Sequence, residues 1–238
     1  MIPRTEIQEC LSGVGPTIVY QPIVHLDLGV PIGAEALCRF PGEASTGEWF
    51  KSAESHGLGE QLEMRAVELA IASRSAWPKS WEMVCLNISP DRLANSRLDD
   101  VLELCAGRWV VLELTDQTQL PDQHDLQQRL EQLRRHGLRV AISGLLSRDD
   151  LPRLHRIQPE IVKLDTALTA SLASDEGTSR QFVKDVITRC RLDGALVVAV
   201  GIETAEQIEI ARSIGIEAVQ GYYVGRPQPL DTLMASTP

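Results

Sequence analysis

Polar side chains follow several short apolar segments of the sequence, at the point where each segment ends. Glu35, Asn87 and Glu113 each lie in or near the end of such a segment, and Lys163 lies in a fourth one. Carboxylate and amide oxygens are the ligands that hard cations such as Mg²⁺ and Ca²⁺ prefer. A lysine beside them can orient a water molecule or meet a phosphate. These residue types therefore suit metal-assisted chemistry on a phosphate, provided that the fold brings them together.

The complete set of polar residues at such segment ends is larger. It contains Gln21, Glu35, Arg39, Asn87, Glu113, Asp116, Ser143, Lys163, Asp165, Glu203 and Gln220. For one isolated glutamate, helix capping or pairing with a neighbouring base is the simpler interpretation. Polar residues at several segment ends at once favour a shared site.

The apolar segments have the length and composition of buried β-strands. They are short and rich in Val, Ile and Leu, as parallel strands covered on both faces must be. The predicted strands are 17–24, 33–40, 83–89, 109–115, 138–143, 161–165, 195–201 and 218–225. Amphipathic stretches between them, such as 59–77, 124–137 and 178–194, predict helices.

About eight strands alternating with helices predict an α/β fold, a single (β/α)8 TIM-like barrel. The four residues Leu26–Gly29 between the first two strands are too few for a crossover helix. We therefore expect a hairpin there, with the first strand antiparallel to the second. We assign residues 1–15 to an N-terminal extension and residues 16–238 to the barrel domain.

Composition narrows the class of protein. The chain has 238 residues, 43% of them hydrophobic, and a formal net charge of −10. This acidity argues against nucleic acid or an anionic membrane as partner. No apolar run reaches the ~20 residues that span a bilayer, and the first ten residues lack a signal-peptide core, so we expect a cytoplasmic protein. The five scattered cysteines are expected to be reduced thiols.

Seven short motifs occur in an order that resembles a known family. They are YQPIV, GAEALCRF, LNISP, LELTD, VKLD, GIET and QGYYVGRP, between Pro16 and Pro229. In order and spacing they resemble the EAL domain, whose typical members are phosphodiesterases that linearise the bacterial messenger c-di-GMP. The resemblance implies an EAL-type barrel with an antiparallel first strand, two Mg²⁺ or Mn²⁺ ions at its mouth and an attacking water.

The resemblance also assigns roles to individual positions. It implies metal binding by Glu35, Asn87 and Glu113. It implies catalytic positions at Lys163 and Glu203, and dinucleotide binding by Gln21, Arg39 and Gln220.

Three positions depart from the family pattern. Ser143 and Gly144 stand where the family has two consecutive aspartates, and Val200 stands where it has a glutamate. Two-metal hydrolysis needs several carboxylates to hold two adjacent cations. We therefore expect one residual site for Mg²⁺ or Ca²⁺, formed by Glu35, Asn87 and Glu113, and no second one. In this interpretation Lys163 and Glu203 are vestigial.

Asp149 and Asp150 do not replace the missing pair. The segment from Ser147 predicts a helix start, with Ser147 as N-cap and both acids in the first turn.

Three hypotheses follow for function. The first is a catalytically degenerate EAL domain that senses a ligand or binds a protein partner in c-di-GMP signalling. The second is a weak or unusual c-di-GMP phosphodiesterase. The third is an unrelated barrel enzyme for a phosphorylated metabolite, which the series of matching motifs disfavours.

A phosphodiester ~4 Å from Glu35 or Glu113 is repelled by about 4 kcal/mol at a dielectric constant near 20, so c-di-GMP binding should depend on a divalent ion. A homodimer is implied by resemblance only, and the sequence identifies no protein partner.

Overall fold

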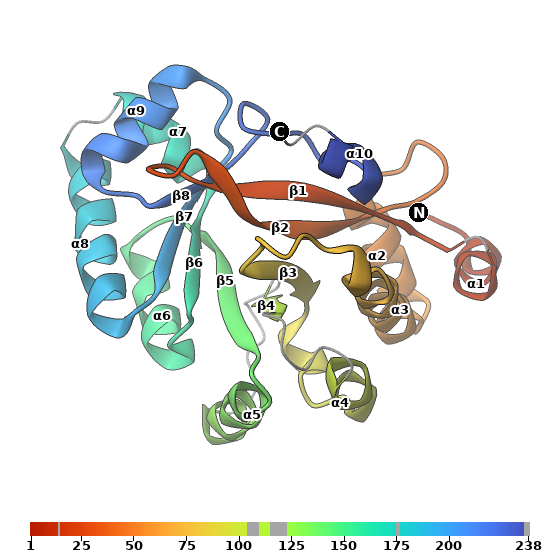
Figure 1. The fold of residues 1–238 in the computed structure, drawn as a ribbon. Helices are drawn as coiled ribbons and strands as arrows, with labels where there is room; N and C mark the ends of the chain where they lie inside the picture. The colour runs from red at the N-terminus through yellow and green to blue at the C-terminus, as the bar shows by residue number, and fades with distance from the viewer. Residues whose placement is uncertain (14, 104–109, 115–122, 175–176, 236–238) are drawn as a thin grey trace.

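The structure of the chain is a closed barrel of eight strands with helices outside it (Figure 1). It is a computed structural model that describes residues 1–13, 15–103, 110–114, 123–174 and 177–235. The strands follow one another around the barrel in chain order. They are β1 (Thr17–His25), β2 (Val30–Arg39), β3 (Met83–Ile88), β4 (Val110–Leu114), β5 (Arg139–Leu145), β6 (Ile161–Leu164), β7 (Leu196–Val200) and β8 (Ala218–Gln220). The predicted α/β barrel is confirmed.

The barrel begins with the predicted hairpin. β1 and β2 pair antiparallel from Thr17 opposite Arg39 to His25 opposite Val30. Gly29 lies in the turn with a φ of 64°, a left-handed conformation that glycine adopts without strain. β1 is also antiparallel to β8, whereas β2 to β8 pair in parallel. All strands except β1 therefore point their carboxyl ends to the same mouth.

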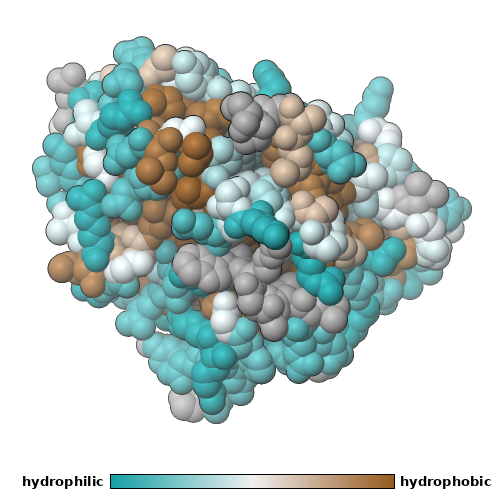
Figure 2. Space-filling view, in the orientation of Figure 1, coloured by the Kyte–Doolittle hydropathy of each residue, from teal (hydrophilic) through white to brown (hydrophobic). Residues whose placement is uncertain are grey.

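Helices occupy the outside of the barrel. They are α1 (Arg4–Ser12), α2 (Thr46–Ser55), α3 (Gly59–Ala72), α4 (Ser96–Glu103), α5 (Gln123–Arg135), α6 (Leu151–Ile157), α7 (Thr166–Ser174), α8 (Thr178–Asp193), α9 (Ala205–Ile214) and α10 (Leu230–Ala235). In Figure 2 the surface over α4 and α5 is mostly hydrophilic, as expected for helices that face water on one side. No helix among the described residues is long and apolar enough to span a bilayer.

Alternation of side chains along the strands creates two separate cores. Outward side chains such as Leu86, Leu112 and Val162 pack under the helices in the larger core. Inward side chains fill the barrel and form a second cluster, made of Ile23, Ile32, Met83, Cys85, Val111, Ala141, Ile161, Val198 and Ala218. Because strand side chains alternate with a period of two, the next inward residues toward the mouth lie directly above this cluster.

The N-terminal helix packs against the barrel's second and third helices. Ile7 and Cys10 of α1 are buried with Trp49 of α2 and Leu62 of α3 in a third apolar cluster. Trp49 stacks on Phe40 at a centroid distance of 4.7 Å. Residues 4–12 of the segment assigned to an N-terminal extension thus form a helix with a buried face.

The last strand is shorter than the predicted segment 218–225. β8 ends at Gln220, and Gly221 follows so close to Ile202 that a Cβ there would lie 2.1 Å from the Ile202 carbonyl oxygen. A side chain at this position is incompatible with the turn. The chain therefore leaves the sheet directly after Gln220.

Candidate active site

A layer of mostly polar side chains lies above the apolar floor of the barrel. Asn87 follows Cys85 by two residues, Glu113 follows Val111, Lys163 follows Ile161 and Gln220 follows Ala218. The parallel register places Asn87 opposite Glu113, and the hairpin places Gln21 opposite Glu35. The strand period and the register thus bring side chains from distant parts of the chain to one mouth.

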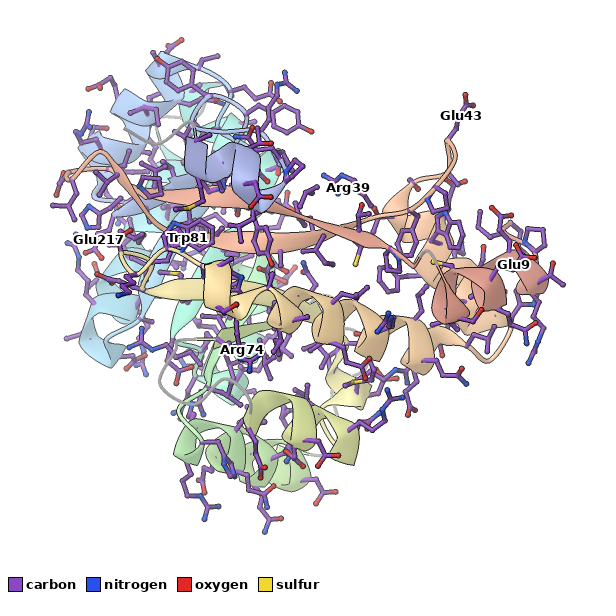
Figure 3. All side chains as sticks on the ribbon, turned by 45° about the vertical axis from the view of Figure 1, so that its right-hand side comes forward. Glu9, Arg39, Glu43, Arg74, Trp81 and Glu217 are labelled. Atoms are coloured by element: carbon purple, nitrogen blue, oxygen red, sulfur yellow. The ribbon has the colours of Figure 1, made fainter. Side chains whose placement is uncertain are left out.

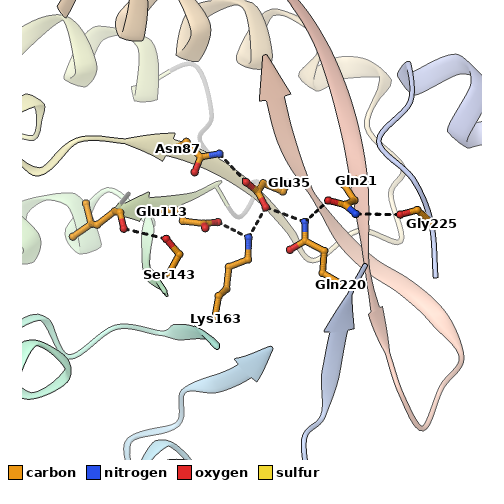
Figure 4. Close-up of polar contacts among 9 residues, drawn as sticks. Gln21, Glu35, Asn87, Glu113, Ser143, Lys163, Gln220 and Gly225 are labelled. Carbon is orange, nitrogen blue, oxygen red and sulfur yellow. Dashed lines mark hydrogen bonds and ion pairs between the residues drawn. The ribbon is translucent and has the colours of Figure 1, made fainter. Parts of the chain in front are cut away.

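Lys163 joins the two glutamates of this layer (Figure 4). Its Nζ lies 2.5 Å from Oε2 of Glu35 and 2.7 Å from Oε2 of Glu113. The lysine side chain is only 2% exposed, and the two carboxylates are also buried. One ammonium therefore compensates two carboxylates, leaving one formal negative charge.

Amide side chains complete the hydrogen bonds of Glu35. Asn87 donates to Oε1 at 2.8 Å, and Gln220 donates to Oε2 at 2.9 Å. Gln220 also donates to Oε1 of Gln21 at 3.2 Å, and Gln21 donates to the carbonyl oxygen of Gly225. The amide oxygen of Gln220 is buried without a hydrogen-bond partner among the described residues. Gln220 is thus held in this layer by its amide nitrogen, which donates to both Glu35 and Gln21.

Burial and neighbouring charges shift the pKa values of the three ionisable groups. Burial, reinforced by the charge of Glu35, raises the pKa of Glu113 to about 7 despite the nearby ammonium. Burial alone would raise the pKa of Glu35, but Lys163 and the amide hydrogen bonds lower it. Burial would lower the pKa of Lys163, but the two glutamates raise it. Glu35 thus carries the more stable negative charge of the two.

The strand ends at Ser143, Gly144 and Val200 lie beside this cluster. A register shift in the β5–β6 pairing places Ser143 and Gly144 between Ile142 and Leu145, where β6 has Lys163 alone. This is a β-bulge, and Gly144 has the left-handed φ of 70° that such a bulge uses. The Ser143 hydroxyl donates to the carbonyl oxygen of Leu114 at 3.4 Å, and its proximity to Glu113 lowers the pKa of that carboxyl. Val200 packs against the apolar floor.

Two predicted site residues do not join the cluster. Arg39 is exposed, and its guanidinium donates to the carbonyl oxygen of Cys38 at 2.8 Å. Figure 3 shows Arg39 projecting from the β1–β2 ribbon. Glu203 is exposed as well, and its backbone N–H donates to Gln207. Both assignments remain predictions from family resemblance.

The other acids near the mouth have local roles. Asp150 accepts hydrogen bonds from the backbone N–H groups of Leu146 and Ser147 at 2.9 Å, and the Ser147 hydroxyl accepts from Asp149 N–H. This is the predicted N-cap, and it begins a short 3₁₀ turn before α6. Asp165 accepts from the N–H of Ala167 in the first turn of α7. Asp116 lies outside the described residues.

A cavity of about 580 Å³ adjoins the cluster beside Asn87. Its apolar walls include Ile18, Phe50 and Leu86, and its polar lining includes Asn87, Glu54, Glu63, Ser89 and Arg92. Sequence spacing does not single out Glu63 or Arg92, because neither follows a strand directly. The sequence feature that could have indicated Glu63 is its position among the apolar residues Leu62, Met64 and Val67 on the buried face of α3.

The donor set suits one hard cation. Glu35, Asn87 and Glu113 supply oxygens from adjacent strands, and such a set with added water is typical of a Mg²⁺ or Ca²⁺ site. Such an ion would compete with Lys163 for the same carboxylate oxygens. Within the part of the chain that the structure describes, no group of three His, Cys, Asp or Glu side chains is placed to hold a metal ion.

Known proteins with similar sequences and folds share this architecture. The bifunctional diguanylate cyclase/cyclic di-GMP phosphodiesterase MucR of Pseudomonas aeruginosa is 28% identical over 246 residues, which cover 97% of this chain and 36% of that protein. A solved EAL domain protein of Listeria monocytogenes superimposes with a TM-score of 0.84 at 21% identity, covering 98% and 97% of the two chains. The chain spans about a third of the length of the first curated relatives that it matches.

Two further solved structures contain the nucleotide. The PaMucR phosphodiesterase in complex with c-di-GMP has a TM-score of 0.78 and 26% identity, covering 96% and 98% of the chains. Klebsiella pneumoniae BlrP1, solved with calcium and c-di-GMP, has a TM-score of 0.76 and 26% identity, covering 95% and 58%. The sequence profile of the EAL domain matches residues 4–227. With this match over nearly the whole chain and the same barrel, the protein belongs to the EAL domain family.

Proposed function

We propose that this EAL domain is catalytically degenerate and acts in c-di-GMP signalling as a ligand-sensing or protein-interaction module. The observation that carries the proposal is the composition of the layer above the barrel floor. Among the described residues it contains two carboxylates, Glu35 and Glu113, and both are bonded to Lys163. Ser143, Gly144 and Val200 at the adjacent strand ends supply no further anionic oxygen. Clamping two cations around an attacking water needs more negative charge than this.

Ligand binding at the mouth has separate support. The adjoining cavity of about 580 Å³ has the volume of a small-molecule site, and Asn87 of the cluster lines it. The cluster retains one net negative charge, which repels a phosphodiester. A divalent ion held by Glu35, Asn87 and Glu113 would reverse that charge and strengthen nucleotide binding. Homodimer formation stays a prediction.

Titration calorimetry with c-di-GMP tests this function. We expect binding that is tighter with Mg²⁺ or Ca²⁺ than with EDTA, together with no linear dinucleotide by chromatography after prolonged incubation. Gln220→Ala should weaken binding, whereas Gln181→Ala on α8, which loses an exposed hydrogen bond to Asp185, should not. No binding under any condition would overturn the nucleotide-sensing proposal.

The alternative is a weak c-di-GMP phosphodiesterase. It is favoured by the retention of Glu35, Asn87, Glu113, Lys163 and Gln220 at one mouth, and by relatives such as MucR. Steady turnover by purified protein that Glu35→Ala abolishes would establish this alternative.

A further inference from the structure

The barrel opens beside Asn87, because β2 and β3 separate there. Their pairing ends at Ala36 opposite Leu86, although β3 continues beside β4 as far as Ile88. The remainder of β2 pairs with β1 alone among the described strands, up to Arg39. We call the resulting gap the β2–β3 cleft; the cavity of about 580 Å³ occupies it. Within the described ranges, the end of β3 therefore lacks a strand partner on its β2 side.

A side chain from α3 takes the place of that missing partner. Glu63 is 8% exposed, and its Oε1 accepts the backbone N–H of Ser89, which follows β3 directly. Its Oε2 accepts the Ser89 hydroxyl at 3.0 Å. A carboxylate that receives a backbone N–H supplies the hydrogen bond that a neighbouring strand would otherwise make. Glu63 thus fixes the backbone two residues beyond Asn87.

The carboxylate is itself held by a shared arginine. Nε of Arg92 lies 3.4 Å from Glu63, and the other guanidinium nitrogens lie 2.7 Å from Glu54 and 2.8 Å from Asp91. Arg92 belongs to a 3₁₀ turn, Pro90–Arg92, directly after Ser89. The ion pairs tie this turn to α2 and α3. The wall of the cleft is therefore linked by ion pairs and hydrogen bonds between α3 and the carboxyl end of β3.

We propose that Glu63 is a positioning residue for the polar cluster, acting through Ser89 to hold the Asn87 side chain on Glu35. The inference rests on the proposed function, because its effect on nucleotide binding requires that the polar cluster binds c-di-GMP. Asn87 donates to Glu35 at 2.8 Å from the part of β3 that no longer pairs with β2. The contact between Glu63 of α3 and Ser89 supports this part of β3. Loss of the contact lets the end of β3 shift along the open cleft, and the Asn87 amide then moves away from Glu35.

The first test uses the protein without ligand. The side-chain amide signals of Asn87 in a ¹H–¹⁵N spectrum are identified by their absence in Asn87→Ala. We expect these signals to shift in Glu63→Ala, which removes the contact with Ser89, and in Glu63→Asp, whose side chain is too short to make it. They should stay near the wild-type position in Glu63→Gln, whose side chain has the same length and keeps one acceptor oxygen. Glu68→Ala on the same helix, which breaks surface ion pairs with Arg65 and Arg97, is the matched control.

The second test is a double-variant cycle with c-di-GMP as probe. We expect Glu63→Ala to weaken binding about tenfold in the wild-type background and less than about threefold in Asn87→Ala, because coupled residues are not additive. Equal losses in both backgrounds, or unshifted Asn87 signals in Glu63→Ala and Glu63→Asp, would overturn the positioning role. If Glu63→Ala does not fold, Glu63→Asp takes its place in the cycle. If wild-type protein binds no c-di-GMP, the proposed nucleotide binding fails, and the ligand-free spectra still decide the role of Glu63.

Discussion

Lys163 controls the charge of the barrel mouth. Its ammonium lies between Glu35 and Glu113, with almost no access to water. Removing one member of a buried ion network leaves the other charges without compensation. The resulting loss of stability is larger than the stability that a surface ion pair contributes. Lys163 is thus a structural counter-ion for both glutamates.

Lys163→Met should therefore be strongly destabilising. We expect a loss of roughly 3–5 kcal/mol in the free energy of unfolding, since two buried carboxylates then face each other. Urea denaturation measures this loss. Adding Glu113→Gln should recover part of it, because only one buried carboxylate then remains. A single variant within about 1 kcal/mol of wild type would contradict the counter-ion role.

Glu113 makes the stability of the protein depend on pH. Its pKa of about 7 in the folded chain lies above its ordinary value of 4.5, so the folded state holds a proton that the unfolded state has released. Stability from this group is therefore present at low pH and lost as the pH rises toward 7, by up to about 1.4 kcal/mol per pH unit.

Glu113→Gln should remove this pH dependence. We expect the melting temperature of the variant to fall less than that of wild type between pH 5 and pH 7.5. Both proteins keep Glu35, whose lowered pKa affects stability only in more acidic solution. Identical pH profiles of wild type and variant, followed by thermal unfolding, would show that Glu113 stays ionised throughout this range.

Among the secondary-structure elements, β5 and its turn into α6 contain two of the positions at which we expect a departure from the family pattern, Ser143 and Gly144. The bulge at Ser143 and Gly144 faces Lys163, and the chain then enters the Ser147 cap without a longer loop. The acids of this turn are used for capping. The local geometry of this turn therefore stabilises the start of α6.

Ser147→Ala tests the capping role. The variant loses the acceptor for the Asp149 N–H, which should cost about 1 kcal/mol of stability. Calcium affinity, measured by calorimetry, should not change. Asp149→Ala, which keeps the cap hydroxyl, is the matched control for metal binding; a fall in calcium affinity in that variant would identify Asp149 as a ligand instead.

Restoring the family's acids at the strand ends tests the cause of the expected inactivity. Ser143→Asp, Gly144→Asp and Val200→Glu together should increase affinity for Mn²⁺ and give partial turnover, whereas each alone should do little, because a second cation requires charge that is already present. Gly144 has a φ of 70°, which aspartate tolerates better than most residues. A folded triple variant without added metal affinity would refute the alignment of these positions.

On the scale of the whole molecule, α1 and the barrel share a core. Ile7 is fully buried in the cluster with α2 and α3, and α2 leads directly into the helix that carries Glu63. A shared core predicts that the N-terminal helix and the barrel unfold together.

Ile7→Ala measures this coupling. Deleting a buried isoleucine side chain should cost roughly 2–5 kcal/mol, and the unfolding curve should stay a single transition. Ile2, at the edge of the same cluster, provides a matched control, since Ile2→Ala removes a less completely buried side chain and should cost less. Two separate transitions in Ile7→Ala would show that α1 folds independently.

The sequence alone was sufficient for the architecture and for part of the site. Continuous apolar runs alternating with amphipathic ones predict a parallel barrel, and the four-residue turn at Leu26–Gly29 allows nothing but a hairpin. The period of two along each strand puts Glu113 on the same face as Val111, and Lys163 on the same face as Ile161, whatever packs around them. Local rules of this kind depend only on neighbouring residues, which is why the Ser147 cap was also predictable.

Tertiary structure decided which of these residues meet. Strand register and side-chain reach place Lys163 on both glutamates but leave Arg39 and Glu203 in solvent. The contact between Glu63 and Ser89 joins residues 26 positions apart and depends on where β2 and β3 separate. Neither spacing nor composition encodes such a contact, because it arises from the packing of a helix over an incomplete sheet.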